Sequence, residues 1–131
     1  MGRIVTVGAA LVAAVILALP AGAQDLIERT ELSRKPLSGS DVMEVVLAKL
    51  VIHPGGYIPK HTHPGDENSV VAVGGQVILP NGKEVPFAAD TPLNFAEGVV
   101  HGGLTVAGDM PITIYTTHIV DKTKPFQTLA E

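Results

Sequence analysis

Histidines are the residues of this 131-residue chain best suited to chemistry, because the chain contains no cysteine. The lack of cysteine excludes disulfides, thiol nucleophiles and cysteine-ligated zinc or iron–sulfur centres. Any metal ion must therefore be held by histidine, aspartate or glutamate side chains. No glycine-rich phosphate loop and no Gly-x-Ser-x-Gly motif occurs in the sequence. The five histidines are His53, His61, His63, His101 and His118.

His61 and His63 are separated by one residue, in a segment that has the pattern of a short strand. Alternate side chains of a strand project from one face, about 7 Å apart along the backbone, so both imidazoles can reach one ion. A turn at residues 64–66 then reverses the chain, and Glu67 begins the returning segment. Its carboxylate can complete a facial set of two imidazoles and one acid, which leaves open coordination positions for a substrate or oxygen.

His101 lies between glycines, with Gly98 before it and Gly102 and Gly103 after it. Glycines allow the backbone to pass close to a site and to place a ring there. A third imidazole would give three neutral nitrogens and one oxygen around a divalent transition metal such as Fe, Mn, Ni, Zn or Cu. The His-x-His spacing alone is more typical of an exposed pair or a pair packed in a core than of a metal site.

The elements that must position these residues are short strands. Glycine (14 residues) and proline (10 residues) interrupt the apolar runs, and no helical periodicity follows residue 24. Asn81 and Gly82 predict a hairpin in which both central turn residues have a positive φ. The pattern predicts an all-β sandwich or barrel of about eight to ten strands. The main predicted strands are residues 42–53, 60–63, 69–73, 76–79, 85–87, 92–95, 99–101, 104–106 and 112–120.

The N-terminus has the features of a secretory signal peptide: one basic residue, Arg3, then an apolar run and a small-residue ending. We expect cleavage after Ala23, export to the periplasm or the medium, and no membrane association after cleavage. An uncleaved anchor is the alternative, but Pro20 and Gly22 interrupt the apolar run near its end.

The remaining chain predicts one domain in three parts. Residues 24–41 are polar and form an N-terminal arm or edge segment, residues 42–121 form the β-barrel, and residues 122–131 form a C-terminal tail. The arm could cover the cavity mouth of a partner subunit. A net charge of −4, no Lys/Arg cluster and only 4% aromatic residues argue against a nucleic-acid partner.

The segment Gly55-x5-His61-x-His63-x3-Glu67-x6-Gly74 resembles the first motif of the cupin superfamily position for position. The resemblance covers about residues 42–120, and the stretch between the motifs is short, as in small microbial cupins.

The second cupin motif, Gly-x5-Pro-x-Gly-x2-His-x3-Asn, is matched at Gly98 and His101. Asp90 replaces its first glycine, Ala96 its proline and Thr105 its asparagine. These departures affect turn and support positions, and the ligand position is intact.

The resemblance implies a double-stranded β-helix, a jelly-roll-like cupin barrel, with a metal ion inside its mouth and a tendency to form homodimers. It also implies that the metal ligands are His61, His63, Glu67 and His101.

Such an ion keeps a net charge of +1 and can act as a Lewis acid toward a small oxygenated organic molecule. The favoured hypothesis is a secreted metal-dependent enzyme (a dioxygenase, isomerase or lyase) in which Glu67 is both ligand and catalytic proton acceptor. The alternatives are a module that binds a metal or a small ligand without turnover, and a metal that only holds two sheets together. We expect a cavity lined by Val, Ile, Ala and Gly, with no second acid–base group besides Glu67.

The other polar residues have ordinary roles on this interpretation. His53 and His118 have no spacing partner and are assigned to the fold rather than to the site. Asp66 is a turn residue that could also orient an imidazole, and Tyr57 and Gln76 could line the mouth of the cavity.

Overall fold

The computed structural model describes residues 26–131, which contain strands and no helix. This agrees with the all-β prediction. The predicted signal peptide and its cleavage site lie outside the described residues, and the described part has no helix that could span a membrane. In chain order the strands are β1 (Ile27–Pro36), β2 (Met43–Ile52), β3 (Tyr57–Ile58), β4 (His61–Thr62), β5 (Gly65–Val73), β6 (Gly75–Ile78), β7 (Glu84–Phe87), β8 (Pro92–Phe95), β9 (Leu104–Ala107), β10 (Ile112–Asp121) and β11 (Thr128–Leu129).

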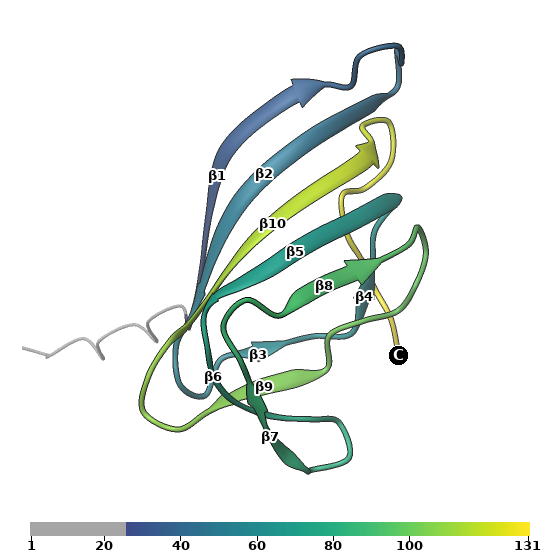
Figure 1. The fold of residues 1–131 in the computed structure, drawn as a ribbon. Coiled ribbons are helices and arrows are strands. Elements are labelled where there is room, and N and C mark those ends of the chain that lie inside the picture. The colour runs from purple at the N-terminus through teal and green to yellow at the C-terminus, as the bar shows by residue number, and fades with distance from the viewer. Residues whose placement is uncertain (1–25) are drawn as a thin grey trace, which may run out of the picture.

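The strands form two main antiparallel sheets that face each other (Figure 1). The larger sheet has the order β1-β2-β10-β5-β8 and contains the long strands. The smaller sheet has the order β3-β9-β6-β7. Strands β4 and β11 form a separate pair, and Figure 1 shows β4 close to the C-terminus.

Period-two alternation explains how the larger sheet builds the interior. Along β5 the side chains of Glu67, Ser69 and Val71 are buried, and those of the intervening residues are exposed. Strand β10 alternates in the same way. The buried apolar residues of both sheets form one core between them, made of Ile52, Val71, Val77, Val106, Ile112 and Ile114.

Both ends of the described chain are paired with neighbouring strands. The segment predicted as an arm or edge forms β1, which pairs along β2 at the edge of its own sheet. The C-terminal segment returns to the barrel, where β11 pairs with β4. Residues near both chain ends can therefore contribute to the interior of the same subunit.

Three local predictions differ from the structure near the turns. The strand predicted at residues 60–63 is only β4, and β5 begins at Gly65, where a turn was predicted. Residues 99–101 form a single bridge, between His61 and His101, instead of a strand. Short strands follow the barrel's curvature, which residue type alone does not encode.

The predicted hairpin between β6 and β7 exists, but its turn is of another kind. The N–H of Gly82 donates to the carbonyl of Leu79, so Pro80 and Asn81 are the central residues. Only Gly82 has a positive φ, of 80°. Proline fixes a φ that suits the first central position of a type I turn, so a three-residue loop ending in glycine replaces the predicted two-residue loop.

Asp90, which replaces the first glycine of the second motif, adopts the left-handed conformation with a φ of 64°. Aspartate tolerates this conformation better than most residues. The N–H of Asp90 donates to the carbonyl of Val71, so the turn stays attached to β5. The substitution therefore preserves the backbone path.

Candidate metal centre

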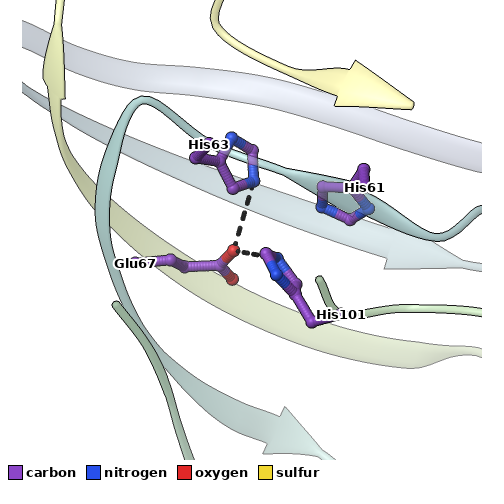
Figure 2. A group of neighbouring side chains, drawn as sticks. All are labelled: His61, His63, Glu67 and His101. Carbon is purple, nitrogen blue, oxygen red and sulfur yellow. Dashed lines mark hydrogen bonds and ion pairs between the residues drawn. The ribbon is translucent and has the colours of Figure 1, made fainter. Parts of the chain in front are cut away.

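The four predicted ligand residues meet at one point inside the barrel. His61, His63, Glu67 and His101 each offer one ligand atom, and all four atoms lie within 4.8 Å of one another. Figure 2 shows the rings of His63 and His101 against the carboxylate of Glu67, with His61 beside them. His61 comes from β4, His63 from the connection between β4 and β5, and Glu67 from β5. His101 comes from the connection between β8 and β9.

A backbone bridge places the rings of His61 and His101 together. The N–H of each residue donates to the carbonyl of the other, at 2.9 and 3.0 Å, and their ring centroids are 4.2 Å apart. Gly102 makes this approach possible, because its φ is +88° and a Cβ there would lie 2.4 Å from the carbonyl oxygen of Pro59. The ring of Phe95 stacks on His101 at 4.0 Å.

Each of the three imidazoles donates its Nδ1–H to a backbone carbonyl. His61 donates to Pro59 at 2.7 Å, and His101 donates to Val99 at 2.9 Å. His63 donates to Phe126 in the C-terminal segment, also at 2.7 Å. These bonds fix the ring orientation and leave Nε2 of each neutral ring as the free ligand nitrogen.

The carboxylate of Glu67 is the anionic centre of the cluster. Ser69 donates to Oε1 at 2.7 Å, and Nε2 of His101 and His63 lie 2.9 and 3.4 Å from Oε2. Burial alone would raise the pKa of this carboxyl group, but the adjacent imidazoles of His118 and His63 and the hydrogen bond from Ser69 outweigh burial and hold its pKa far below the ordinary value. Glu67 is therefore ionised at neutral pH.

This donor set fits a divalent transition metal. Three imidazole nitrogens and one ionised carboxylate, with ring orientation fixed by outer hydrogen bonds, are the ligands such ions prefer. The contact of His101 with Glu67 also supports a metal ion at this position. A carbonyl and a carboxylate both accept, so the bare ring must carry protons on both nitrogens to bond both groups. An ion between the two groups would take the place of the second proton.

His118 is the site residue that sequence reasoning missed. It faces Glu67 across the β10–β5 pair, and its Nε2 lies 3.3 Å from Oε2 of Glu67. Burial lowers its pKa, and Nδ1 is buried without a hydrogen-bond partner in the described structure. The signal that could have found it is cross-strand register: His118 is at an inward position of β10, the predicted final strand.

The remaining polar candidates lie away from the cluster. His53 contacts Glu28 at 2.6 Å on the surface. Asp66 accepts a hydrogen bond from the backbone of Glu97. Tyr57 is exposed, and in the described structure neither Tyr57 nor Gln76 lines the cavity, so the two predictions for the mouth are wrong.

The cluster forms one wall of a cavity of about 310 Å³ between the two sheets. Side chains packed against the core line the cavity, and they are mainly Leu, Ile and Phe where Val and Ala were predicted. His118 and Arg29 are polar lining residues that the prediction omitted. The lining consists of Ile27, Arg29, Leu50, Ile58, Pro59, His61, His63, Glu67, Phe87, Leu93, Phe95, His101, Gly102, Leu104, Ile114, Thr116, His118, Phe126 and Gln127.

Comparison with known proteins identifies the fold. No protein-family model matches the chain, and no curated protein matches its sequence. A cupin domain from Bordetella pertussis is 17% identical with a TM-score of 0.53, over 74% of this chain and 96% of that one. A protein with a double-stranded β-helix domain from Klebsiella pneumoniae is 22% identical with a TM-score of 0.56, over 83% and 88%. The chain therefore has the double-stranded β-helix fold of the cupin superfamily, as predicted.

An enzyme shares this fold. The DMSP lyase DddQ from Ruegeria pomeroyi is 19% identical to the chain, with a TM-score of 0.57. The match covers 86% of this chain but 56% of the lyase, so the chain spans little more than half of the lyase's length.

Proposed function

We propose that this protein binds one divalent transition metal through His61, His63, Glu67 and His101, and that the ion acts on a small oxygenated organic molecule in the adjoining cavity. The observation that carries the proposal is the convergence of four ligand atoms from separate segments on one wall of an apolar cavity. A metal that only held the sheets together would not need an adjacent cavity.

The reaction class we propose is that of a metal-dependent dioxygenase, isomerase or lyase. A bound ion would supply Lewis acidity for an enolate or hydroxy-acid oxygen. Glu67 would accept a proton through its carboxylate, while the Ser69 hydroxyl holds the other oxygen in place. Leucine, isoleucine and phenylalanine side chains would exclude water from the ligand. The second candidate is a binding module without turnover, which the same cavity and ligand set also support.

Metal titration tests the centre directly. We expect wild-type protein, stripped with chelator and titrated with Zn²⁺ in a calorimeter, to bind one ion, and His101→Ala to bind it far more weakly. The matched control is His53→Ala, because His53 lies outside the cluster. Equal Zn²⁺ affinity in the wild type and His101→Ala would refute the proposed ligand set.

Turnover distinguishes the enzyme from the binding module. Protein loaded separately with Fe²⁺, Mn²⁺, Ni²⁺, Cu²⁺ and Zn²⁺ is screened against small phenols, diketones and hydroxy acids, with oxygen consumption and product formation as readouts. For any active pair, Glu67→Gln under saturating metal should bind the organic ligand and not convert it. Binding without turnover across the whole panel favours the module.

We also propose that the protein is exported, with cleavage after Ala23, and that it forms a homodimer. The basic residue and apolar run before Ala23 support export. Apolar side chains on the outer face of the five-stranded sheet, including Val45, Leu47 and Ile119, support self-association. Mass spectrometry of the exported chain should give Gln24 as its first residue, and light scattering should give twice the chain mass.

A further inference from the structure

Arg29 adds a second charged side chain to the lining of the cavity. Among its lining residues in the described chain, Arg29 and Glu67 are the two with a permanent charge at neutral pH, and the others are mainly apolar. Arg29 lies on β1 opposite Leu50, which also lines the cavity. Its side chain is 36% exposed, so it is partly shielded from water.

The guanidinium of Arg29 is available to a ligand. Its nearest acid is Glu31, at 3.9 Å, which is too far for a hydrogen bond. Glu31 instead accepts two hydrogen bonds from Arg34, at 3.0 and 2.9 Å. Within residues 26–131 Arg29 makes no side-chain hydrogen bond, and it is held in place by the ring of Phe126, 5.0 Å from its guanidinium carbon.

Phe126 also connects Arg29 to the metal centre. Its ring centroid is 5.1 Å from that of His63 and 4.8 Å from that of His118. The guanidinium and both imidazoles therefore lie around the same aromatic ring. One small molecule can reach both Arg29 and the metal centre. Two further lining groups have buried atoms without a hydrogen-bond partner in the described structure: Thr116 Oγ1 and His118 Nδ1. Unpaired buried polar atoms are costly unless a ligand or water bonds them.

Charge decides which ligand fits. A divalent ion held by Glu67 and three neutral imidazoles leaves a net charge of +1 at the metal centre, and Arg29 adds another +1 to the cavity lining, with no further acid among the lining residues. A planar guanidinium binds a carboxylate through two parallel hydrogen bonds. We propose that the cavity ligand is a small organic acid with an apolar body, and that Arg29 binds its carboxylate. This inference rests on the proposed function in one respect, because it assigns the ligand's other end to the metal centre.

Benzoate and benzamide test the proposal, because they have the same shape and differ in charge. Their binding is measured by calorimetry on metal-free and Zn²⁺-loaded protein. We expect benzoate to bind both forms more tightly than benzamide. Arg29→Gln should weaken benzoate binding by roughly ten- to a hundredfold and leave benzamide unchanged. Arg29→Lys should keep part of the preference, because it retains the charge and loses the paired geometry.

The matched control is Lys35→Gln, which removes one positive charge from the same strand. Lys35 pairs with Val45, whose neighbour Val46 is buried, and it does not line the cavity, so this variant should bind benzoate like the wild type. An undiminished preference for benzoate in Arg29→Gln would overturn the proposal. So would benzoate binding that requires Zn²⁺ and ignores Arg29, since the carboxylate would then be on the ion. Benzoate binding to the metal-free protein tests the role of Arg29 even if Zn²⁺ does not bind. Failure of the Arg29 proposal can therefore be distinguished from failure of the proposed metal centre.

Discussion

Two histidine–glutamate pairs sit on the same sheet in opposite environments. His118 and Glu67 face each other across β10 and β5, with side-chain exposures of 4% and 10% and a closest distance of 3.3 Å. His53 and Glu28 meet where β2 ends beside β1, with exposures of 34% and 60% and a distance of 2.6 Å. The surface contact is shorter, yet the buried one belongs to the site.

The difference teaches that surroundings, rather than contact distance, give such a pair its role. Water screens the charges of an exposed pair, and such pairs contribute about 0.2–1 kcal/mol or nothing measurable. A buried carboxylate must instead be satisfied by several partners. Glu67 has Ser69 on one oxygen and imidazoles on the other, an arrangement that also suits a cation.

The two pairs should differ most in Zn²⁺ affinity when the charge of Glu67 or of Glu28 is removed. Glu67→Gln keeps the shape of the side chain and removes an anionic ligand. We expect Zn²⁺ affinity to fall by more than the roughly ten- to hundredfold that is typical for losing a residue that only supports a ligand. Glu28→Gln should leave the affinity unchanged. Competition with a chelator of known affinity measures both, and equal effects in the two variants would remove the distinction between the pairs.

The second-largest effect is expected from low pH, which should release the metal from the buried cluster. Imidazole ligands bind only when neutral, so protons compete with the ion below about pH 6.5. Burial lowers the pKa of His61, so protonation of this ring, and the metal loss that it causes, begins at a lower pH than for an exposed histidine. Elemental analysis after dialysis at pH 7 and pH 5 measures the loss. Unchanged metal content at pH 5 would contradict imidazole ligation.

A smaller effect is expected from His118→Gln, with His53→Gln as the matched variant. Loss of the imidazole beside Glu67 should reduce Zn²⁺ affinity by about tenfold, because His118 helps to hold a ligand and is not one of the four proposed ligands. His53→Gln should have no effect on affinity. Thermal unfolding of the metal-free variants checks that both are folded. A loss as large as that of Glu67→Gln would make His118 a ligand.

The all-β class and the main strands could be predicted because their signals are local, whereas the double-stranded β-helix was implied by the resemblance of the motifs to those of cupins. Apolar runs separated by Gly and Pro predict short strands, and the strands predicted at residues 42–53 and 112–120 match β2 and β10 closely. The turn at Asn81 could not be predicted from the Asn-Gly pair alone, because Pro80 imposes its own φ on the loop. Bridge-like contacts such as His61–His101 depend on how the chain crosses itself, which no local pattern contains.

The site likewise contains residues that local spacing predicts and residues that it does not. His61, His63 and Glu67 lie within seven residues, so spacing and strand periodicity predict that they meet. His118 and Arg29 reach the cavity through strand register: His118 lies opposite Glu67 of β5, far away in the sequence, and Arg29 lies opposite Leu50 of the next strand, β2. Cavity-lining residues that depend on strand register are therefore the part of the site that the sequence alone does not predict.

The surface pair offers the smallest and most specific comparison. Glu28→Gln removes the charge that faces His53 while both side chains remain in water, so the free energy of unfolding should change by less than about 0.5 kcal/mol. Urea unfolding of the metal-free protein at low salt and in 1 M NaCl measures the change, and the salt should abolish whatever remains, because exposed charges are screened over about 3 Å at that concentration. The change that Glu67→Gln causes in the free energy of unfolding should be the same at low salt and in 1 M NaCl, since the carboxylate is nine-tenths buried and salt does not screen it. A salt-insensitive loss in Glu28→Gln would mean that the exposed pair is ordered like the buried one, and that burial is not what separates them.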